Sequence, residues 1–374
     1  MAPASTTARD GLGPHFDARS CSSCHFMDGR GNPHNNPSSL VIKISFLNNG
    51  EYQPVPSYGG QLTRFAIDEF EPEGSVKINQ VNSPVLFPYN QLTENAYQIN
   101  WLKGLPKSNT IISPRIAPHL IGLGLIEAID EQSIYKKHDP DDKDGDGISG
   151  RVNLIESNNG EQTLGRFGWQ AESPTVAFQV GKALINDMGI TNLIFSENIC
   201  EDNLGHTQCA KGVETEISQH LFDQLVLYSK ALAVPRIRVD NKKFKAGLSL
   251  FNKVQCDSCH TPFYVTDDNH PETQFANKTI APFTDLLLHD MGDQLADKDI
   301  DGNIYTTEWR TPPLWGIGLF DEVNKHTYFL HDGRAKSIHE AILWHGGEAK
   351  KSKELYTELN SNEKKQLIEF LNAI

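Results

Sequence analysis

The sequence predicts a mainly α-helical protein with two domains, long irregular loops and a minor β component in its N-terminal half. Two observations carry this prediction. The pentapeptide Cys-x-x-Cys-His occurs twice, at Cys21–His25 and at Cys256–His260, and amphipathic helical patterns surround the second copy. A chain of 374 residues is long enough for two or three domains, so each motif is expected to lie in a domain of its own.

The expected elements of the N-terminal part are few, because this region is rich in Pro, Gly and Asn. A strand is predicted over residues 40–47, where β-branched residues alternate with polar ones. Helices are predicted over 175–188, directly after a proline, and over 213–232. Ala233–Arg236 contains a proline that ends the second helix. We therefore place the domain boundary there, with domains at 1–235 and 236–374.

The C-terminal part carries two clearer helical patterns. Residues 242–254 place Phe244, Leu248 and Phe251 on one stripe that leads into Cys256. Residues 361–374 place Leu367, Phe370 and Leu371 on one apolar face, although Ser361 and Lys364 do not form a capping box. A helix leading into the motif and a C-terminal helix packed on it are typical of a cytochrome c fold.

The two motifs have the spacing by which c-type haem is attached. Each cysteine forms a thioether with the haem, and the histidine binds the iron as proximal ligand. A thioredoxin-like redox pair needs no histidine after the second cysteine, and zinc needs four ligands at each site. The sequence therefore predicts two covalent haems, on Cys21, Cys24 and His25 and on Cys256, Cys259 and His260.

Composition excludes some classes of function. The formal net charge is −14, which disfavours nucleic-acid binding, because phosphates require a basic surface. An acidic surface suits attraction of a basic redox partner, although it also serves solubility alone. The chain has no run of 18 apolar residues, so no transmembrane segment is expected.

The two remaining cysteines, Cys200 and Cys209, lie close together in a polar stretch. A disulfide between them is the economical interpretation in an oxidising compartment. Covalent haem attachment also takes place outside the bacterial inner membrane, so both features favour the periplasm. The first ten residues have no apolar core, and we expect that a signal peptide or lipid anchor lies upstream of them.

Several segments together carry a family resemblance. They are FDARSCSSCHFMDGRG, SPRIAPHLIGLGLIEAI, DGDGISGRVN, GRFGWQA, INDMGIT, DLLLHDMGDQLAD, EWRTPPLWGIGL and FLHDGRAKSIHEAILWHGGEA. They resemble the di-haem oxidoreductase family, whose members are classed as peroxidases or thiol oxidoreductases. The family is similar to bacterial di-haem cytochrome c peroxidases and to the di-haem enzyme that matures the quinone of methylamine dehydrogenase. In those proteins one haem takes in electrons and the other reacts with peroxide.

The resemblance implies three candidate catalytic residues: Trp169 between the haems, Gln179 ten residues later, and Asp187 before Met-Gly. A carboxylate beside the open iron position can move a proton between the peroxide oxygens, and an amide can orient the peroxide. Taken singly, the three would be a core tryptophan, a solvated glutamine and a helix-end charge. Asp187 is one methylene shorter than the glutamate usual in the peroxidases, which shortens its reach.

The resemblance also implies axial ligands. The peroxidases place a distal methionine fourteen residues after the histidine of a Phe-His-Asp-Gly turn, and this chain has His345 at that distance from His331. His345 is therefore expected to bind the C-terminal haem iron opposite His260, and Met291 is the rival ligand. For the N-terminal haem the distal position is expected to be open or displaceable, with His34 and His119 as the histidines that could fill it.

Two acidic segments match calcium-loop patterns. Asp297, Asp299, Asp301 and Glu308 fit a twelve-residue loop, in which alternate carboxylates converge on the ion. Asp142, Asp144 and Asp146 form a second candidate that has no terminal glutamate. Two prolines follow Glu308, which makes an EF-hand helix impossible there, so each segment remains either a calcium site or a solvated acidic turn.

The sequence thus predicts a periplasmic di-haem peroxidase-like oxidoreductase. Electrons would enter at the C-terminal haem from a small redox protein of the cytochrome c or cupredoxin type, and hydrogen peroxide or a similar oxidant would be reduced at the N-terminal haem. The alternatives are a non-enzymatic di-haem electron carrier and a di-haem oxidase that modifies a partner protein. The sequence leaves open whether the protein forms a homodimer. Thiol oxidation ranks last, since only Cys200 and Cys209 could perform it.

Overall fold

The computed structural model describes residues 11–34, 39–48, 51–68, 70–83, 92–156, 160–196 and 215–374. About 30% of the structure is helix and 23% is strand, so the prediction of a mainly α-helical protein is wrong. The error lies in the N-terminal half, where strands occupy stretches that the sequence analysis treated as irregular loops. These strands are mostly polar, and their two-residue alternation is therefore a weak signal.

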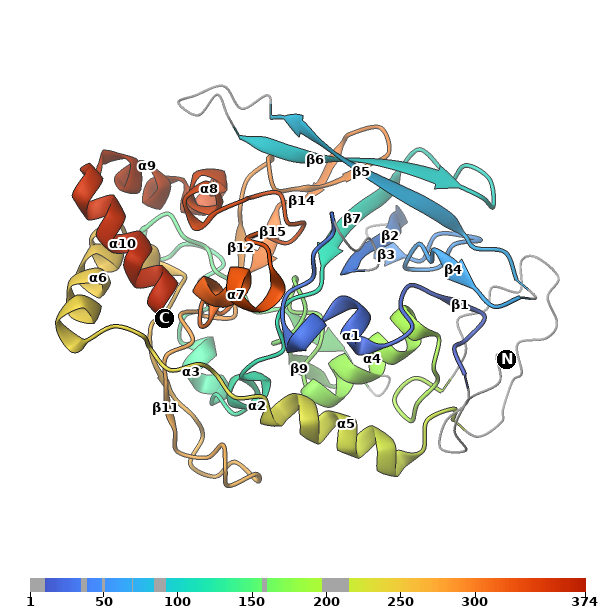
Figure 1. Cartoon of the computed structure of the whole chain (residues 1–374), viewed down its shortest axis with the longest axis horizontal. Coiled ribbons are helices and arrows are strands. Elements are labelled where there is room, and N and C mark those ends of the chain that lie inside the picture. Colours follow the sequence, from blue (N-terminus) through green and yellow to red (C-terminus); the bar gives the residue numbers. More distant parts are fainter. Residues whose placement is uncertain are drawn as a thin grey trace.

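A five-stranded antiparallel sheet forms the framework (Figure 1). Its order is β14 (Ile304–Thr306), β13 (Asp297–Asp299), β7 (Thr110–Ile116), β2 (Leu40–Asn48) and β3 (Glu51–Gln53). The predicted strand over residues 40–47 is confirmed as β2, in which Leu40, Ile42 and Ile44 are buried on one face. The sheet joins strands from before and after residue 235, and the division into two domains remains a prediction.

A long two-stranded hairpin lies at the top of the molecule in Figure 1. It consists of β5 (Gly74–Asn82) and β6 (Thr93–Trp101), which pair along their whole length. Val76 and Ile78 pack on the main hydrophobic core, while most of the other residues of β5 are exposed. The remaining strand pairs are short: β1 (His15–Phe16) with β4 (Phe65–Ala66), β8 (Leu154–Glu156) with β9 (Gln162–Leu164), β10 (Tyr264–Val265) with β11 (Thr279–Ile280), and β12 (Leu288–Asp290) with β15 (Glu308–Arg310).

The long helices begin and end close to the predicted positions. Helix α4 (Val176–Met188) is capped by the Thr175 side chain, which accepts a hydrogen bond from Phe178 N, and ends at Gly189 in the left-handed conformation. Helix α5 (Gln219–Ala231) starts later than predicted because Ser218 is its N-cap. The shorter helices are α1 (Cys21–Cys24), α2 (Leu123–Glu127), α3 (Glu131–Tyr135), α7 (Phe320–Asn324), α8 (Ile338–Trp344) and α9 (Lys350–Glu358).

Helices α6 (Asn241–Lys253) and α10 (Ser361–Ala373) pack against each other as the sequence predicts. Their contact is close, because a Cβ built at Gly247 would lie 2.3 Å from Cβ of Phe370. A capping box does start α10, one residue earlier than the pair tested in the sequence: Asn360 and Glu363 bond to each other's backbone N–H groups.

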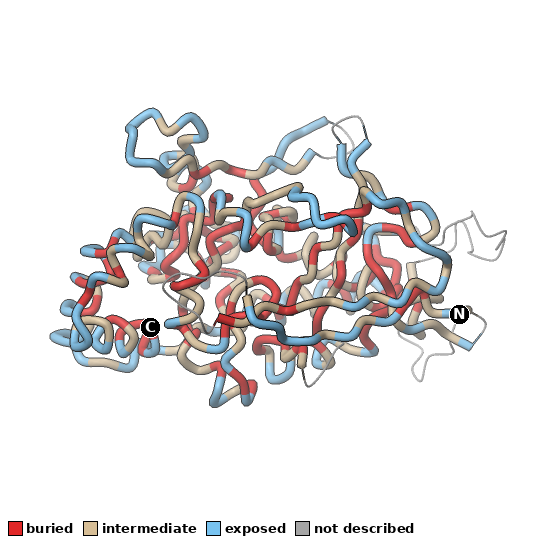
Figure 2. The backbone as a smooth tube through the Cα atoms, turned by 90° about the horizontal axis from the view of Figure 1, so that it is seen from above, coloured by how far each residue is buried: buried red, intermediate tan, exposed pale blue. Residues whose placement is uncertain are grey.

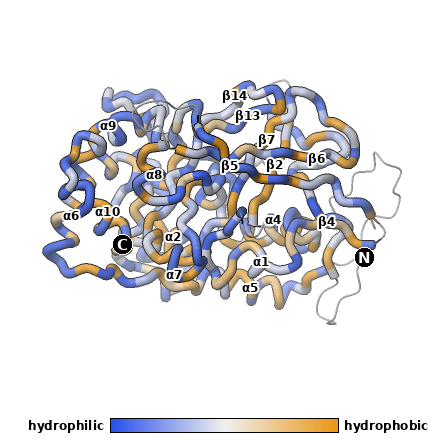
Figure 3. Tube along the Cα trace, turned by 45° about the horizontal axis from the view of Figure 1, so that its top comes forward, coloured by the Kyte–Doolittle hydropathy of each residue, from blue (hydrophilic) through white to orange (hydrophobic). Residues whose placement is uncertain are grey.

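Buried residues run through the centre of the molecule, and the exposed ones form its outer loops and helix faces (Figure 2). Figure 3 shows apolar and polar stretches interspersed along the whole trace. Within the described ranges, no helix is both long enough and apolar enough to span a bilayer.

Candidate functional site

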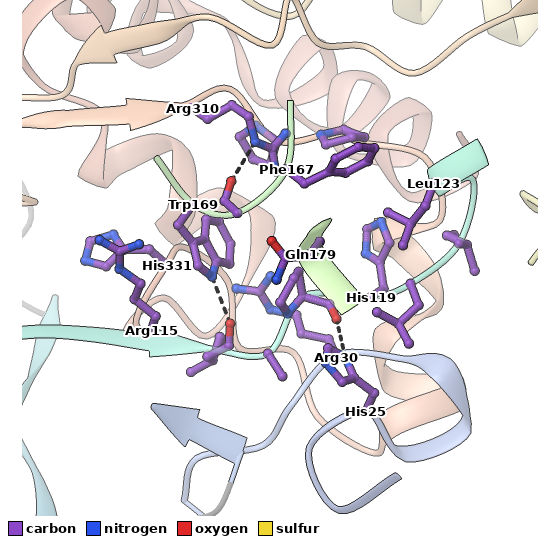
Figure 4. A pocket seen from close by; sticks show the side chains of 18 of the residues that line it. His25, Arg30, Arg115, His119, Leu123, Phe167, Trp169, Gln179, Arg310 and His331 are labelled. Atoms are coloured by element: carbon purple, nitrogen blue, oxygen red, sulfur yellow. Dashed lines mark hydrogen bonds between the residues drawn. The ribbon is translucent and has the colours of Figure 1, made fainter. Parts of the chain in front are cut away.

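A single cavity of about 840 Å³ connects the two Cys-x-x-Cys-His motifs. Its lining includes Cys21, Cys24 and His25 at one end and Cys256, Cys259 and His260 at the other. The motifs are far apart in the sequence, and the fold brings both to one internal space. Figure 4 shows this space with side chains from several elements pointing into it.

The N-terminal motif is held in place by α4. The backbone N–H groups of Asp17 and Ala18, just before the motif, donate to the carbonyl oxygen of Asp187 at 2.8 and 2.9 Å. The motif then forms the single turn α1, and the N–H of His25 donates to Cys21 O at 2.8 Å. The imidazole Nδ1 of His25 bonds to the carbonyl oxygen of Pro118 at 2.7 Å. This bond makes Nδ1 the protonated nitrogen and leaves Nε2 free to bind a metal.

The C-terminal motif shows the same arrangement. Helix α6 leads into it, and Nδ1 of His260 donates to Phe283 O at 2.9 Å. Burial lowers the pKa of His260 to about 4 and also lowers the pKa of His25. Both imidazoles are therefore neutral at pH 7, which is the form that binds iron. The cavity volume, the two free Nε2 atoms and the adjacent thiols fit two haems.

His345 and Met291, the two predicted rivals for the C-terminal haem, both line the cavity. His345 follows α8, and its Nδ1 donates to Ala341 O at 2.7 Å, so its Nε2 is also free. A charge on His345 would further lower the pKa of His260, which places the two imidazoles within electrostatic reach. His345 therefore has a nitrogen available for a metal, and both residues remain candidates for the ligand.

The two histidines considered for the N-terminal haem differ in position. His34 is not part of the cavity lining, and its ring packs on Tyr328 with 4.6 Å between centroids. His119 lines the cavity, and its Nδ1 is buried without a hydrogen-bond partner. Burial lowers the pKa of His119 to about 3, so its imidazole is neutral.

Trp169 is buried in the cavity wall between segments of both halves of the chain (Figure 4). Its indole N–H donates to Ile116 O at 2.8 Å, and its carbonyl accepts from Arg310 N at 2.9 Å. The guanidinium of Arg30 lies 5.3 Å from the centre of a Trp169 ring, within the range of a cation–π contact. These contacts fix the indole in one orientation.

Gln179 and Asp187 lie on α4, eight residues and therefore about 12 Å apart along the helix axis. Both line the cavity, and Oε1 of Gln179 is buried without a partner. Burial raises the pKa of Asp187 to about 6, although a hydrogen bond from Gln61 at 2.9 Å acts in the opposite direction. The predicted acid and amide thus both line the cavity from α4, and the backbone of Asp187 contacts the segment before the N-terminal motif.

A cluster of cations lines the same wall. Lys43 and Arg115 each approach Oε1 of Glu172 at 2.6 Å. Lys182 also faces the cavity, and burial lowers its pKa to about 8. These three cations share the wall with the carboxyls of Glu172 and Asp187, and cations in this position suit the negative propionates of a haem.

Sequence reasoning missed two groups of functional interest. Gln61 and Arg30 carry no motif signal, since a single glutamine or arginine in an irregular segment has no periodic pattern. The second group surrounds His289, whose ring bonds to Asp285 at 2.8 Å and to Glu348 at 2.7 Å beside the sulfur of Cys259. The two carboxylates raise the pKa of His289 well above its ordinary value.

The structure separates the predicted calcium ligands. No three of Asp297, Asp299, Asp301 and Glu308 offer oxygens within 4.8 Å of one another, and Glu308 instead pairs with Arg151. Asp142, Asp144 and Asp146 do converge, on an exposed turn. Calcium binding remains a prediction at both places. Cys200 and Cys209 lie outside the described residues, as does their predicted disulfide.

The chain was compared with known proteins. Residues 70–374 match the family model described as "Di-haem oxidoreductase, putative peroxidase". The match contains Trp169, Gln179, Asp187 and the second motif, and it begins after the first.

A solved structure of hydrazine synthase from Kuenenia stuttgartiensis aligns with 98% of this chain and 84% of the other, at 14% identity and a TM-score of 0.40, a similarity too low to carry an argument. No curated protein matches the sequence. The family model covers most of the chain, and the chain belongs to the di-haem oxidoreductase family.

Proposed function

We propose that this protein is a periplasmic di-haem c-type oxidoreductase that reduces peroxide at the N-terminal haem with electrons received at the C-terminal haem. One observation carries the proposal. Among the described residues, the α4 wall of the cavity has an acid without an ion pair, Asp187, and an amide with an unpartnered oxygen, Gln179, and the backbone of Asp187 is bonded to the residues just before the N-terminal motif. The two ends of the cavity are therefore chemically unequal.

The residues present can hold the two cofactors. Cys21 and Cys24 would attach one haem and Cys256 and Cys259 the other, while His25 and His260 would bind the irons through Nε2. When bound, the haems supply the two electrons of the reduction and, at the N-terminal end, an open position for the oxidant. We assign His345 as the sixth ligand of the C-terminal haem, since its Nε2 is free in the same cavity.

Reduction of hydrogen peroxide consumes two electrons and two protons and yields two water molecules. Asp187 would take the proton from one peroxide oxygen and return it to the other, so that the leaving oxygen departs as water. Its raised pKa of about 6 suits both steps near neutral pH. Gln179 would orient the peroxide by accepting a hydrogen bond at its unpartnered Oε1.

Trp169 would provide the electron path between the two ends of the cavity. It is buried in the shared wall, its indole N–H donates to Ile116 O, and its backbone carbonyl accepts from Arg310 N. The electron donor would be a small redox protein of the cytochrome c or cupredoxin type. The net charge of −14 favours a donor with a basic contact surface.

One observation favours a second candidate, a non-enzymatic electron carrier. His119 lines the cavity with an unpartnered Nδ1, and a sixth ligand at the N-terminal iron would close it to peroxide. The two functions therefore differ in whether the N-terminal iron keeps a coordination position open for peroxide.

The test uses the purified di-haem protein in its fully oxidised and half-reduced states. We expect high-spin iron and cyanide binding at one haem in at least one state, and steady-state reduction of hydrogen peroxide with a reduced small cytochrome. Two low-spin haems in both states, with no cyanide binding and no peroxide consumption, would overturn the proposal in favour of the carrier.

A further inference from the structure

The side chain of Gln61 lies behind Asp187 and contacts two carboxylates. Its Nε2 is 2.9 Å from Oδ1 of Asp187, 2.8 Å from Oδ2 of Asp17 and 3.2 Å from the carbonyl oxygen of Asn186. All three neighbours are acceptors when the carboxyls are ionised. The amide must therefore present its NH₂ group to them, which settles its orientation.

The backbone around Gln61 is firmly held. Ile44 N donates to Gly60 O at 3.1 Å, and Leu62 N donates to Ile42 O at 2.9 Å, so the residues on both sides are bonded to β2. Gln61 itself is only 8% exposed. Its side chain thus has one stable placement, and it serves as a rigid donor toward Asp187.

The second acceptor, Asp17, is paired with an arginine. Asp17 is fully buried, and its Oδ1 accepts from the Arg64 guanidinium at 2.7 Å. Asp187 has no ion pair among the described residues, and its Oδ2 makes no hydrogen bond there. One oxygen of Asp187 is thus occupied by a donor, and the other is free.

We propose that Gln61 is a positioning residue that keeps Oδ1 of Asp187 as a hydrogen-bond acceptor and confines the exchangeable proton of the carboxyl to Oδ2. The physical reason is that an N–H donor opposes a proton on the oxygen it contacts. This inference rests on the proposed role of Asp187, since a proton is of use in peroxide reduction only on an oxygen that the substrate can reach. Asp187 itself lines the cavity.

Charged and titratable groups from several neighbouring segments interact electrostatically with the Asp187 carboxyl. They are Asp17 and Cys24 from the N-terminal segment, Lys43 from β2, Arg64 from the loop before β4, and Lys182 from α4. Gln61 is the neutral group among its contacts, so its replacement by another neutral residue changes the hydrogen bond and leaves these charges in place.

The choice of substitution follows from a second cavity of about 30 Å³, large enough for about two water molecules. Gln61 and Asn186 line both this space and the main cavity. A small residue at position 61 would join the two and admit water to Asp187. Gln61→Met keeps approximately the length of the side chain and removes the amide together with its donor, and Gln98→Met on the exposed face of β6 is the matched control.

The experiment records infrared difference spectra of the full-length di-haem protein against pH. The C=O band that disappears in Asp187→Asn identifies the Asp187 carboxyl. Loss of the donor destabilises the ionised form, so we expect Gln61→Met to move the midpoint of this band upward by about one to two pH units. Gln98→Met should leave it unchanged. The Gln61→Leu variant, which also lacks the donor and carries no charge, should move it in the same direction and serves if the methionine variant fails to assemble.

The outcomes separate this inference from the proposed function. An unchanged midpoint in both position-61 variants overturns the positioning role, even where peroxide is still reduced. A shifted midpoint in a protein that does not consume peroxide supports the positioning role and refutes the proposed function instead. A shift equal to that of Gln98→Met also overturns the inference.

Discussion

Asp187 should cost the protein stability at neutral pH while it enables the reaction, and Asp187→Asn tests both effects at once. The substitution keeps the shape of the side chain and keeps an oxygen that can accept the hydrogen bond from Gln61. It removes the charge and the exchangeable proton. Asp187 is half-buried and lines the cavity, and burial disfavours its charged form.

The magnitude follows from the pKa. Burial raises the pKa of Asp187 from 3.8 to about 6, which at about 1.4 kcal/mol per pH unit corresponds to at most about 3 kcal/mol. An acid whose pKa is raised by folding stabilises the protein only below its unfolded pKa. That contribution is lost as the pH rises from about 4 through about 6. Asp187→Asn should therefore be more stable than the wild type at pH 7.5, and the difference should shrink toward pH 4.

Denaturant unfolding of both haem-loaded proteins at pH 7.5 and pH 4.5 measures this difference, and stopped-flow mixing with peroxide measures the reaction. We expect the substitution to slow the peroxide reaction by about 10²–10⁴-fold and to remove the decline in rate below about pH 6. A variant that is less stable at pH 7.5, with a deficit independent of pH, would refute the assigned desolvation. An unchanged rate would refute the role of the proton.

Three further predictions concern other parts of the molecule. Trp169→Phe should cost about 1 kcal/mol in unfolding free energy through its lost hydrogen bond and should slow electron transfer between the haems, measured by flash reduction. His345→Met should raise the reduction potential of the C-terminal haem in a redox titration, whereas Met291→Leu should leave this potential unchanged. A potential that changes only in Met291→Leu would make Met291 the ligand. Gly247→Ala should lower the unfolding free energy by about 1–3 kcal/mol in a denaturant titration, because its methyl group would overlap Phe370; an unchanged midpoint would contradict that packing.

The helices were predictable because their signals are local. The stripe of α6, the apolar face of α10 and the proline before α4 each fix an element within one or two residues. The β structure was not predictable to the same degree. Strands β5 and β6 are largely polar on their exposed face, and a two-residue alternation with few apolar positions gives little evidence of a strand.

The candidate site shows the same division between local and non-local information. The motifs predict His25 and His260 from five residues each, and the resemblance predicts Gln179 from its distance to Trp169 and Asp187 from the Met-Gly that follows it. Gln61 could not be found this way. Its contact with Asp187 joins residues 126 positions apart and depends on the register of its segment against β2. No feature of the sequence near Gln61 encodes that register by itself.

The titratable groups at the two ends of the cavity differ in their partners. This difference is why we assign peroxide reduction to the N-terminal end. Beside Cys259, the imidazole of His289 is held between Asp285 and Glu348, so both of its nitrogens are already bonded to carboxylates. Moving a proton from this cluster to a substrate would break an ion pair buried in a low dielectric, which is costly. Asp187 has no such partner among the described residues and can gain or lose a proton without that cost. This difference is the reason that we propose proton-coupled reduction at the N-terminal end and electron transfer alone at the C-terminal end.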